Sequence, residues 1–132
     1  MKLSAIRWGA AVVGALVAEI AMIAAAFAWV AIYSYLVHPG ESPAFYQRYA
    51  EAASPWVALL AGVPIFYLVC RRIGGRATAL AVFAIYFCFD APIVIFASNR
   101  PLPAWFVALN YLCKCSACYL GGNRRGAPAR LP

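Results

Sequence analysis

Acidic side chains are scarce in this chain of 132 residues, which has four Asp and Glu residues against eleven Lys and Arg residues. Charged residues of all kinds make up 11% of the sequence, and hydrophobic residues make up 66%. A soluble globular domain is nearer one-quarter charged and one-half apolar. A chain this short cannot bury so much apolar surface in one small core. The composition therefore argues against an ordinary soluble domain and favours a protein whose solvent is lipid.

Histidine is almost absent, and the common catalytic motifs are missing. The single histidine, His38, cannot supply both axial ligands of a transmembrane bis-histidine haem site. The sequence shows no Ser-His-Asp arrangement, no phosphate-binding glycine loop and no dinucleotide fingerprint. We therefore expect no cofactor, and the sequence does not favour an enzyme.

The sequence has four apolar runs, each long enough or nearly long enough to form a membrane-spanning helix, which takes roughly 17–25 residues. They predict an all-α membrane protein with four transmembrane helices. In the first connection, Ser42-Pro43 is typical of an N-cap followed by proline at the first helical position, so we expect a short interfacial helix over residues 44–53. Ser54-Pro55 repeats this start for the second span. The four runs are residues 8–37, about 55–70, 77–97 and 102–120.

The four runs and their connections predict a single membrane domain of residues 1–120. Residues 121–132 are rich in Gly, Pro and Arg, which predicts a disordered, basic cytoplasmic tail. A cleaved signal peptide is the alternative for the N-terminus, with small residues at 24–26 as a cleavage site. However, the first apolar run exceeds the roughly 7–15 apolar residues of a signal peptide, and Glu19 interrupts it.

The basic residues of the predicted loops fall mainly on one side. Nine lie on one side, and only Arg48 and Arg100 lie on the other. Because Lys and Arg enrichment in short loops marks the cytoplasmic face, we expect an integral protein of a bacterial inner (plasma) membrane with both termini cytoplasmic. The net charge of +7 then reflects topology and attraction to anionic lipids at that face, and it does not indicate nucleic-acid binding. The nine residues are Lys2, Arg7, Arg71, Arg72, Arg76, Lys114, Arg124, Arg125 and Arg130.

Two of the four acidic residues lie inside the apolar runs, Glu19 in the first and Asp90 in the third. A carboxylate at the centre of an inserted helix costs about 2.5–3.5 kcal/mol or more, so such residues are commonly functional. At about 1.5 Å per residue, Glu19, Asp90 and Asn110 reach similar depths near the middle of the bilayer. Pro92 leaves the carbonyl of Cys88 without its helical donor, as happens at transporter sites. We predict an ion or substrate site at Glu19, Asp90 and Asn110.

The five cysteines give only a weak indication of metal binding. Cys115 and Cys118 would share one face of a helix, whereas Cys113 points elsewhere. A four-thiolate site would also need Cys70 and a frayed helix end. We therefore predict no metal site, with Cys70, Cys115 and Cys118 as the weak candidates, and we interpret these side chains as small apolar filler.

Two classes of function fit such a chain. The first is a proton- or cation-linked transporter or channel in which Glu19 and Asp90 bind the proton or cation. The alternative is a non-catalytic membrane subunit or scaffold whose buried polar residues fix helix packing. Rows of small residues such as Ala10, Gly14 and Ala18 allow close approach of a helix from the same chain or a second subunit. They would accommodate a homo-oligomer or another membrane protein as partner.

Overall fold

The computed structural model describes residues 6–94 and 102–123 of the chain. Within these ranges it contains five α-helices, the π-helical turn η2, a π-helical stretch at residues 93–94 and no β-strand, so the all-α prediction is confirmed for this part of the chain. The elements are α1 (Trp8–Ile32), η2 (Tyr33–Val37), α2 (Pro43–Leu60), α3 (Gly62–Ile73), α4 (Arg76–Pro92) and α5 (Ala104–Asn123).

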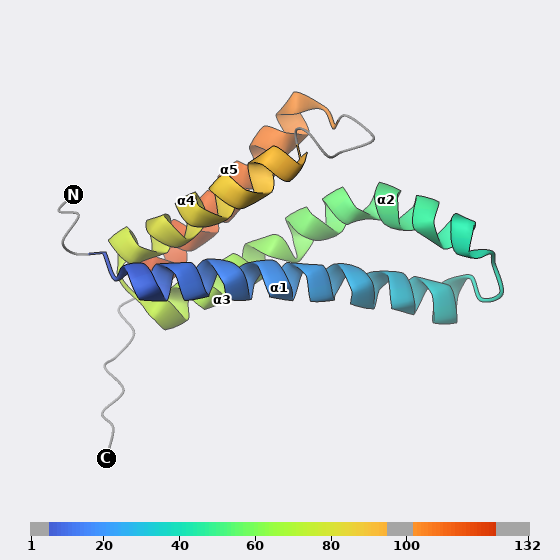
Figure 1. Cartoon of the computed structure of the whole chain (residues 1–132), viewed down its shortest axis with the longest axis horizontal. Helices are drawn as coiled ribbons and strands as arrows, with labels where there is room; N and C mark the ends of the chain where they lie inside the picture. Colours follow the sequence, from blue (N-terminus) through green and yellow to red (C-terminus); the bar gives the residue numbers. More distant parts are fainter. Residues whose placement is uncertain (1–5, 95–101, 124–132) are drawn as a thin grey trace, which may run out of the picture.

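Helix α1 continues directly into η2, and together they form the longest straight element of the molecule (Figure 1). This stretch, Trp8–Val37, has 30 residues and is long and apolar enough to cross a membrane. The bent pair α2 and α3 makes a second such stretch if it is counted as one span. Among the described residues the structure thus supports one or two membrane-length helices, and the four-span arrangement stays a prediction.

Helix α2 begins where the sequence predicts a helix start. The Ser42 hydroxyl accepts a 3.3 Å hydrogen bond from the backbone N–H of Phe45. Pro43 occupies the first helical position, where its missing N–H costs nothing. The N-cap interpretation of this segment is therefore confirmed.

The second predicted helix start, at Ser54-Pro55, is wrong. Helix α2 runs through Pro55 without a break, so residues 44–53 form its first half and not a separate interfacial helix. The Ser54 hydroxyl donates a 2.7 Å hydrogen bond back to the carbonyl of Ala50. A serine that bonds the preceding turn in this way lies within a helix and does not cap a new one.

The chain bends instead between α2 and α3, by 40° around Ala61. Pro64 has no N–H to donate to the carbonyl of Leu60, and proline is the commonest cause of a sharp kink one turn before itself. Helical hydrogen bonding resumes at once, because the Ile65 amide donates to the Ala61 carbonyl at 3.2 Å. Helices α2 and α3 therefore follow one another with only Ala61 between them.

Helices α1, α3, α4 and α5 pack around one core, with α5 against both α3 and α4, and α1 against α3 and α4. The second half of α1 and the first half of α2 form a hairpin that projects beyond α4 and α5 (Figure 1). Small side chains of α1 let the other helices approach it closely. The buried core residues of α1, α3 and α4 include Ala11, Ala15, Ala18, Phe66, Cys70, Ala79, Val82 and Tyr86.

Aromatic contacts hold the hairpin closed near its tip. The rings of Tyr33 and Tyr49 stack with centroids 3.5 Å apart. The Tyr46 hydroxyl donates a 2.6 Å hydrogen bond to the carbonyl of His38, and the ring of His38 lies 5.4 Å from that of Tyr33. His38 is thus part of the aromatic cluster that joins η2 to α2.

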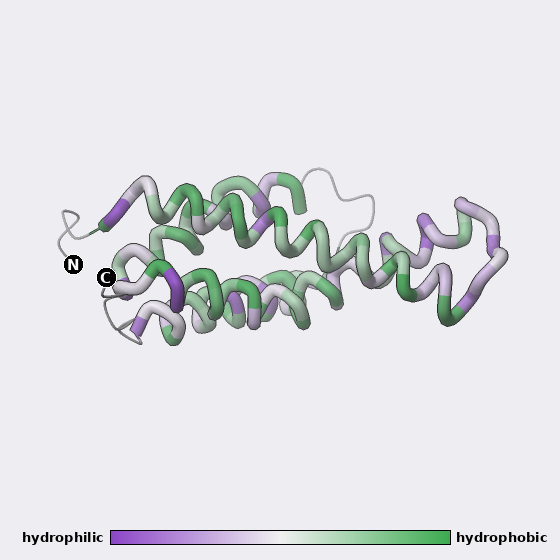
Figure 2. Tube along the Cα trace, turned by 90° about the horizontal axis from the view of Figure 1, so that it is seen from below, coloured by the Kyte–Doolittle hydropathy of each residue, from purple (hydrophilic) through white to green (hydrophobic). Residues whose placement is uncertain are grey.

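Four helix ends meet at the opposite end of the molecule. The Arg7 guanidinium, just before α1, donates to the backbone carbonyls of Ile73 and Gly74 at the end of α3. The Arg76 guanidinium at the start of α4 donates to the side-chain oxygen of Asn123 at the end of α5. Figure 2 shows hydrophilic positions gathered at this end and at the hairpin tip, with mostly hydrophobic positions between them. We call this end, with Arg7, Arg71, Arg72 and Arg76, the basic end.

The other basic residues used for the topology prediction do not lie at the basic end or are not described by the structure. Arg48 lies on α2, away from the basic end. Arg100 lies outside the described residues, as do Lys2, Arg124, Arg125 and Arg130. Lys114 does not belong to this end at all, because it is buried inside the bundle.

Helix α5 continues to Asn123, beyond the predicted end of the fourth run at residue 120. Gly121 and Gly122 are buried there. A Cβ atom on Gly121 would lie 2.5 Å from a backbone oxygen of α3, and one on Gly122 would lie 2.5 Å from the Cβ of Ala79 on α4. The two glycines thus allow a close helix approach, and residues 124–132 of the predicted tail lie outside the described part.

Candidate functional site

Lys114 on α5 is fully buried, with 0% of its surface exposed. Its Nζ donates a 2.8 Å hydrogen bond to the hydroxyl of Tyr86 on α4 and lies 4.9 Å from the centre of that ring. The rings of Phe66 and Tyr111 lie 5.9 and 6.0 Å from the same nitrogen. A hydrogen bond and three aromatic rings thus surround the ammonium group, which attracts the negative faces of such rings.

The sequence-based assignment of Lys114 to the cytoplasmic basic residues is wrong. The side chain lies in the interior because it shares a helix face with Asn110 and Tyr111, which precede it by four and three residues. Its position six residues before the end of the fourth apolar run at residue 120 was the signal that could have revealed this. A basic residue that far inside an apolar run is commonly part of a buried polar contact.

Asp90 on α4 takes part in a second cross-link to α5. Its Oδ2 accepts a 2.7 Å hydrogen bond from the hydroxyl of Tyr111. Each helix therefore contributes one tyrosine and one ionisable side chain, with Tyr86 and Asp90 on α4 and Tyr111 and Lys114 on α5. The two tyrosine rings are 6.4 Å apart, so the two pairs are neighbours.

A cavity of about 180 Å³ opens against these pairs, and we call it the polar cavity. The Oδ1 atom of Asn110 is buried and has no hydrogen-bond partner among the described residues. The cavity has room for water molecules, and a water with several polar partners could satisfy this atom. Its polar lining consists of Ser54, Tyr86, Asp90, Asn110, Tyr111 and Lys114.

Glu19 on α1 is half-buried and is not part of the lining of the polar cavity. Its Oε2 is buried and unpartnered within the described part of the chain. The charges of Asp90 and Lys114 both act on its carboxyl group. The structure therefore places Asp90 and Asn110 in one cavity, and Glu19 lies within reach of the charges of Asp90 and Lys114.

No cysteine lines the polar cavity. Cys70 and Cys118 are buried and Cys115 is half-buried, and all three are free thiols. Within residues 6–94 and 102–123, no group of three or more His, Cys, Asp or Glu side chains is placed to hold a metal ion. The thiol of Cys70 lies 3.8 Å from the carbonyl of Ala79, which is a packing contact between α3 and α4.

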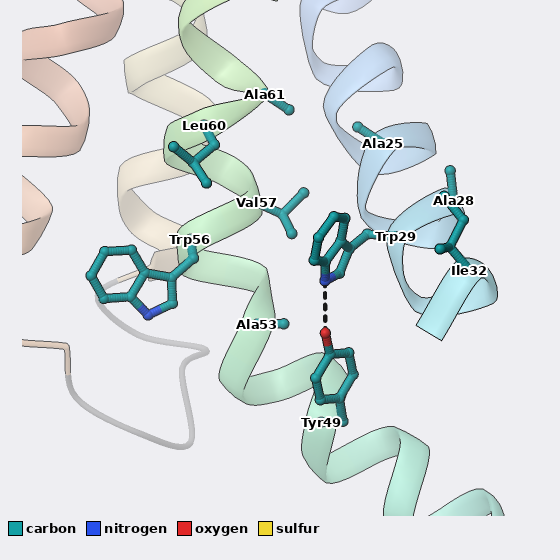
Figure 3. Close-up of a pocket in the computed structure, with 10 residues that line it drawn as sticks. All are labelled: Ala25, Ala28, Trp29, Ile32, Tyr49, Ala53, Trp56, Val57, Leu60 and Ala61. Carbon is teal, nitrogen blue, oxygen red and sulfur yellow. Dashed lines mark hydrogen bonds between the residues drawn. The ribbon is translucent and has the colours of Figure 1, made fainter. Parts of the chain in front are cut away.

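A larger groove of about 610 Å³ lies between α1 and α2 (Figure 3). Trp29 and Tyr49 point toward one another across it, and the indole N–H donates a 2.8 Å hydrogen bond to the phenol oxygen. Its other lining side chains are apolar, including Ile32, Val57 and Leu60. No charged side chain that the structure describes lines this groove.

Comparison of the chain with models of known protein families, with curated proteins and with solved structures gave no match.

Proposed function

We propose that this chain is a four-span integral membrane protein whose buried polar centre takes up and releases a proton in a transporter or channel. The centre consists of Glu19, Asp90 and Lys114, with Tyr86 and Tyr111 as hydrogen-bond donors and acceptors. The observation that carries the proposal is the buried lysine, held next to a cavity that also contains a carboxyl group. In a membrane, ionisable groups in such positions commonly mark ion pathways and proton relays.

The outer face of α1 supports a lipid environment. Val13, Ile20 and Phe27 are 60, 65 and 73% exposed and recur every seven residues along one side of the helix. A water-soluble monomer rarely exposes so continuous an apolar surface. Helices α4 and α5, with 17 and 20 residues, reach about 26 and 30 Å at 1.5 Å per residue. These lengths are close to the thickness of a bilayer core.

Charge balance favours a proton over a metal cation. Two carboxylates and one ammonium group carry a formal charge of −1, which is costly in a medium of low polarity. One bound proton makes Glu19, Asp90 and Lys114 neutral together, whereas the fixed ammonium would repel a metal cation. Uptake of a proton from the polar cavity therefore changes the formal charge of the centre from −1 to zero, and release restores it.

A non-catalytic scaffold is the second candidate, and the two tyrosine cross-links favour it. Tyr86 with Lys114 and Tyr111 with Asp90 tie α4 to α5 at two neighbouring points. Such interhelical hydrogen bonds are worth about 0.6 kcal/mol on average in membrane proteins and help to fix the packing of helices. On this alternative the polar cavity would exchange no protons.

Proteoliposomes loaded with a pH-sensitive dye separate the two candidates. We expect the wild-type chain to carry protons down an imposed pH gradient and Glu19→Gln to abolish that flux while the protein stays folded. Glu51→Gln is the matched control, because Glu51 is exposed on α2, away from the polar centre. Wild-type flux no greater than that of protein-free vesicles would contradict the transport function and favour the scaffold.

A further inference from the structure

We infer that the groove between α1 and α3 binds an acyl chain of an anionic phospholipid, with the lipid phosphate at Arg72. This groove has a volume of about 450 Å³ and lies between the first half of α1 and the second half of α3. The inference rests on the proposal that the chain spans a membrane, and not on proton chemistry. We call it the lipid groove, and its main lining residues are Ala10, Val13, Val17, Leu68, Val69 and Arg72.

The lipid groove has the shape and chemistry of an acyl-chain site. From Val17 to Ala10 it follows α1 for about 10 Å, at 1.5 Å per residue. Except for Arg72, its lining side chains are apolar. Arg72 lies one residue from the end of α3, where the backbone reaches the basic end. The groove therefore runs from the apolar middle of the molecule to a positive charge at one interface.

Arg72 is the only charged residue among the described residues that line the lipid groove. The side chain of Arg72 is exposed and makes no hydrogen bond or ion pair with a residue that the structure describes. Arg7, Arg71 and Arg76 add further positive charge at the same end. None of the four acidic side chains, Glu19, Glu41, Glu51 and Asp90, lines the lipid groove. A ligand that neutralises Arg72 must therefore bring its own negative charge.

A second copy of the chain does not meet this requirement. Copies inserted in the same orientation place their basic ends in the same leaflet, so arginine would face arginine. Among the residues that the structure describes, no acidic side chain lines this groove to form the pair. An anionic phospholipid supplies both parts, an acyl chain for the groove and a phosphate for Arg72. Basic residues at a membrane surface gain about 1 kcal/mol each from anionic lipids.

Native mass spectrometry of the full-length chain in mixed micelles tests the inference. Phosphatidylglycerol and phosphatidylcholine with the same acyl chains are the probes. We expect the wild-type chain to retain one phosphatidylglycerol molecule in preference to phosphatidylcholine. Arg72→Gln should weaken phosphatidylglycerol binding about fivefold, which corresponds to about 1 kcal/mol. Arg71→Gln removes the same charge from an exposed neighbour that does not line the groove, and it should weaken binding much less.

A second pair of variants tests the acyl chain. Ala10→Phe should fill the lipid groove and reduce retention of both lipids, whereas Val12→Phe, at an exposed position outside the groove, should not. Equal losses for Arg71→Gln and Arg72→Gln, or unchanged retention by Ala10→Phe, would overturn the site. Displacement of the lipid by inorganic phosphate alone would also overturn it, because the acyl chain would then contribute nothing.

Membrane insertion is measured separately, so the two proposals fail in different ways. Extraction of the wild-type chain from membranes by alkaline carbonate would overturn the membrane-spanning function itself. An inserted chain that shows no preference for phosphatidylglycerol over phosphatidylcholine would overturn the lipid groove alone.

Discussion

The ammonium nitrogen of Lys114 lies 2.8 Å from the hydroxyl oxygen of Tyr86, and this contact joins α5 to α4 in the interior of the bundle. A matching bond of 2.7 Å joins Tyr111 to Asp90. Because a buried ammonium needs an acceptor far more than an exposed one does, the position of Lys114 depends on Tyr86.

Tyr86→Phe removes the hydroxyl that accepts the hydrogen bond of the Lys114 ammonium. We expect the free energy of unfolding in detergent micelles to fall by about 1–3 kcal/mol, the usual cost of a buried unsatisfied polar group. Tyr35→Phe is the control, because Tyr35 is 79% exposed, and its change should stay within about 0.5 kcal/mol. Adding Lys114→Met to Tyr86→Phe should recover stability, since both polar partners are then gone. No recovery would show that Lys114 is stabilised by other groups.

Gly121→Ala tests the close approach of α5 to α3. The new Cβ would lie 2.5 Å from the Tyr67 carbonyl oxygen and 3.1 Å from the Arg71 nitrogen, and backbone atoms cannot rotate away. We expect a loss of about 1–3 kcal/mol in unfolding free energy, as for other overpacked sites. Gly9→Ala on α1 has nothing within 4 Å and should instead be neutral or stabilising by up to about 1 kcal/mol. Equal effects of the two substitutions would contradict the packing.

Glu19→Gln and Asp90→Asn should be strongly non-additive. The charge of Asp90 acts on Glu19. Neutralising either carboxylate therefore removes the repulsion between them, and the second substitution cannot remove it again. We expect an interaction energy between about 0.5 and 3 kcal/mol in a double-mutant cycle of stability. Glu41 lies on the exposed connection before α2. The changes in unfolding free energy caused by Glu41→Gln and Glu19→Gln should therefore be additive. Additivity of Glu19→Gln and Asp90→Asn would show that the two acids are independent.

Cysteine labelling should place the basic end inside the cell. On a background without the five native cysteines, Arg72→Cys should react with a membrane-impermeant maleimide only after the membrane is opened. Arg48→Cys on α2 should react from outside, because few basic residues accompany it there. Labelling of Arg72→Cys in intact cells would reverse the orientation, and labelling of both positions from one side would contradict the membrane crossing.

The sequence alone was enough for features that depend on local or compositional physics. The excess of apolar residues predicted helices of membrane length, and Trp8–Val37 is one such helix. The Ser42-Pro43 start depends on neighbouring atoms only, and α2 begins there. Asp90 and Asn110 line one cavity, and their similar depth in a bilayer stays a prediction from helical rise along each run.

Only the tertiary structure decided how those features combine. Ser54-Pro55 carries the same two residue types as Ser42-Pro43, yet the helix passes through it, because the Ser54 hydroxyl bonds backward and the chain bends later, before Pro64. The position of Lys114 inside an apolar run was a sequence signal for its burial, but contacts between helices decide which partners a side chain meets. Sequence therefore could not show that Lys114 bonds Tyr86 or that Glu19 stays outside the polar cavity. Sequence gives the distance along each helix, whereas the direction in which a side chain points depends on which helices pack against it.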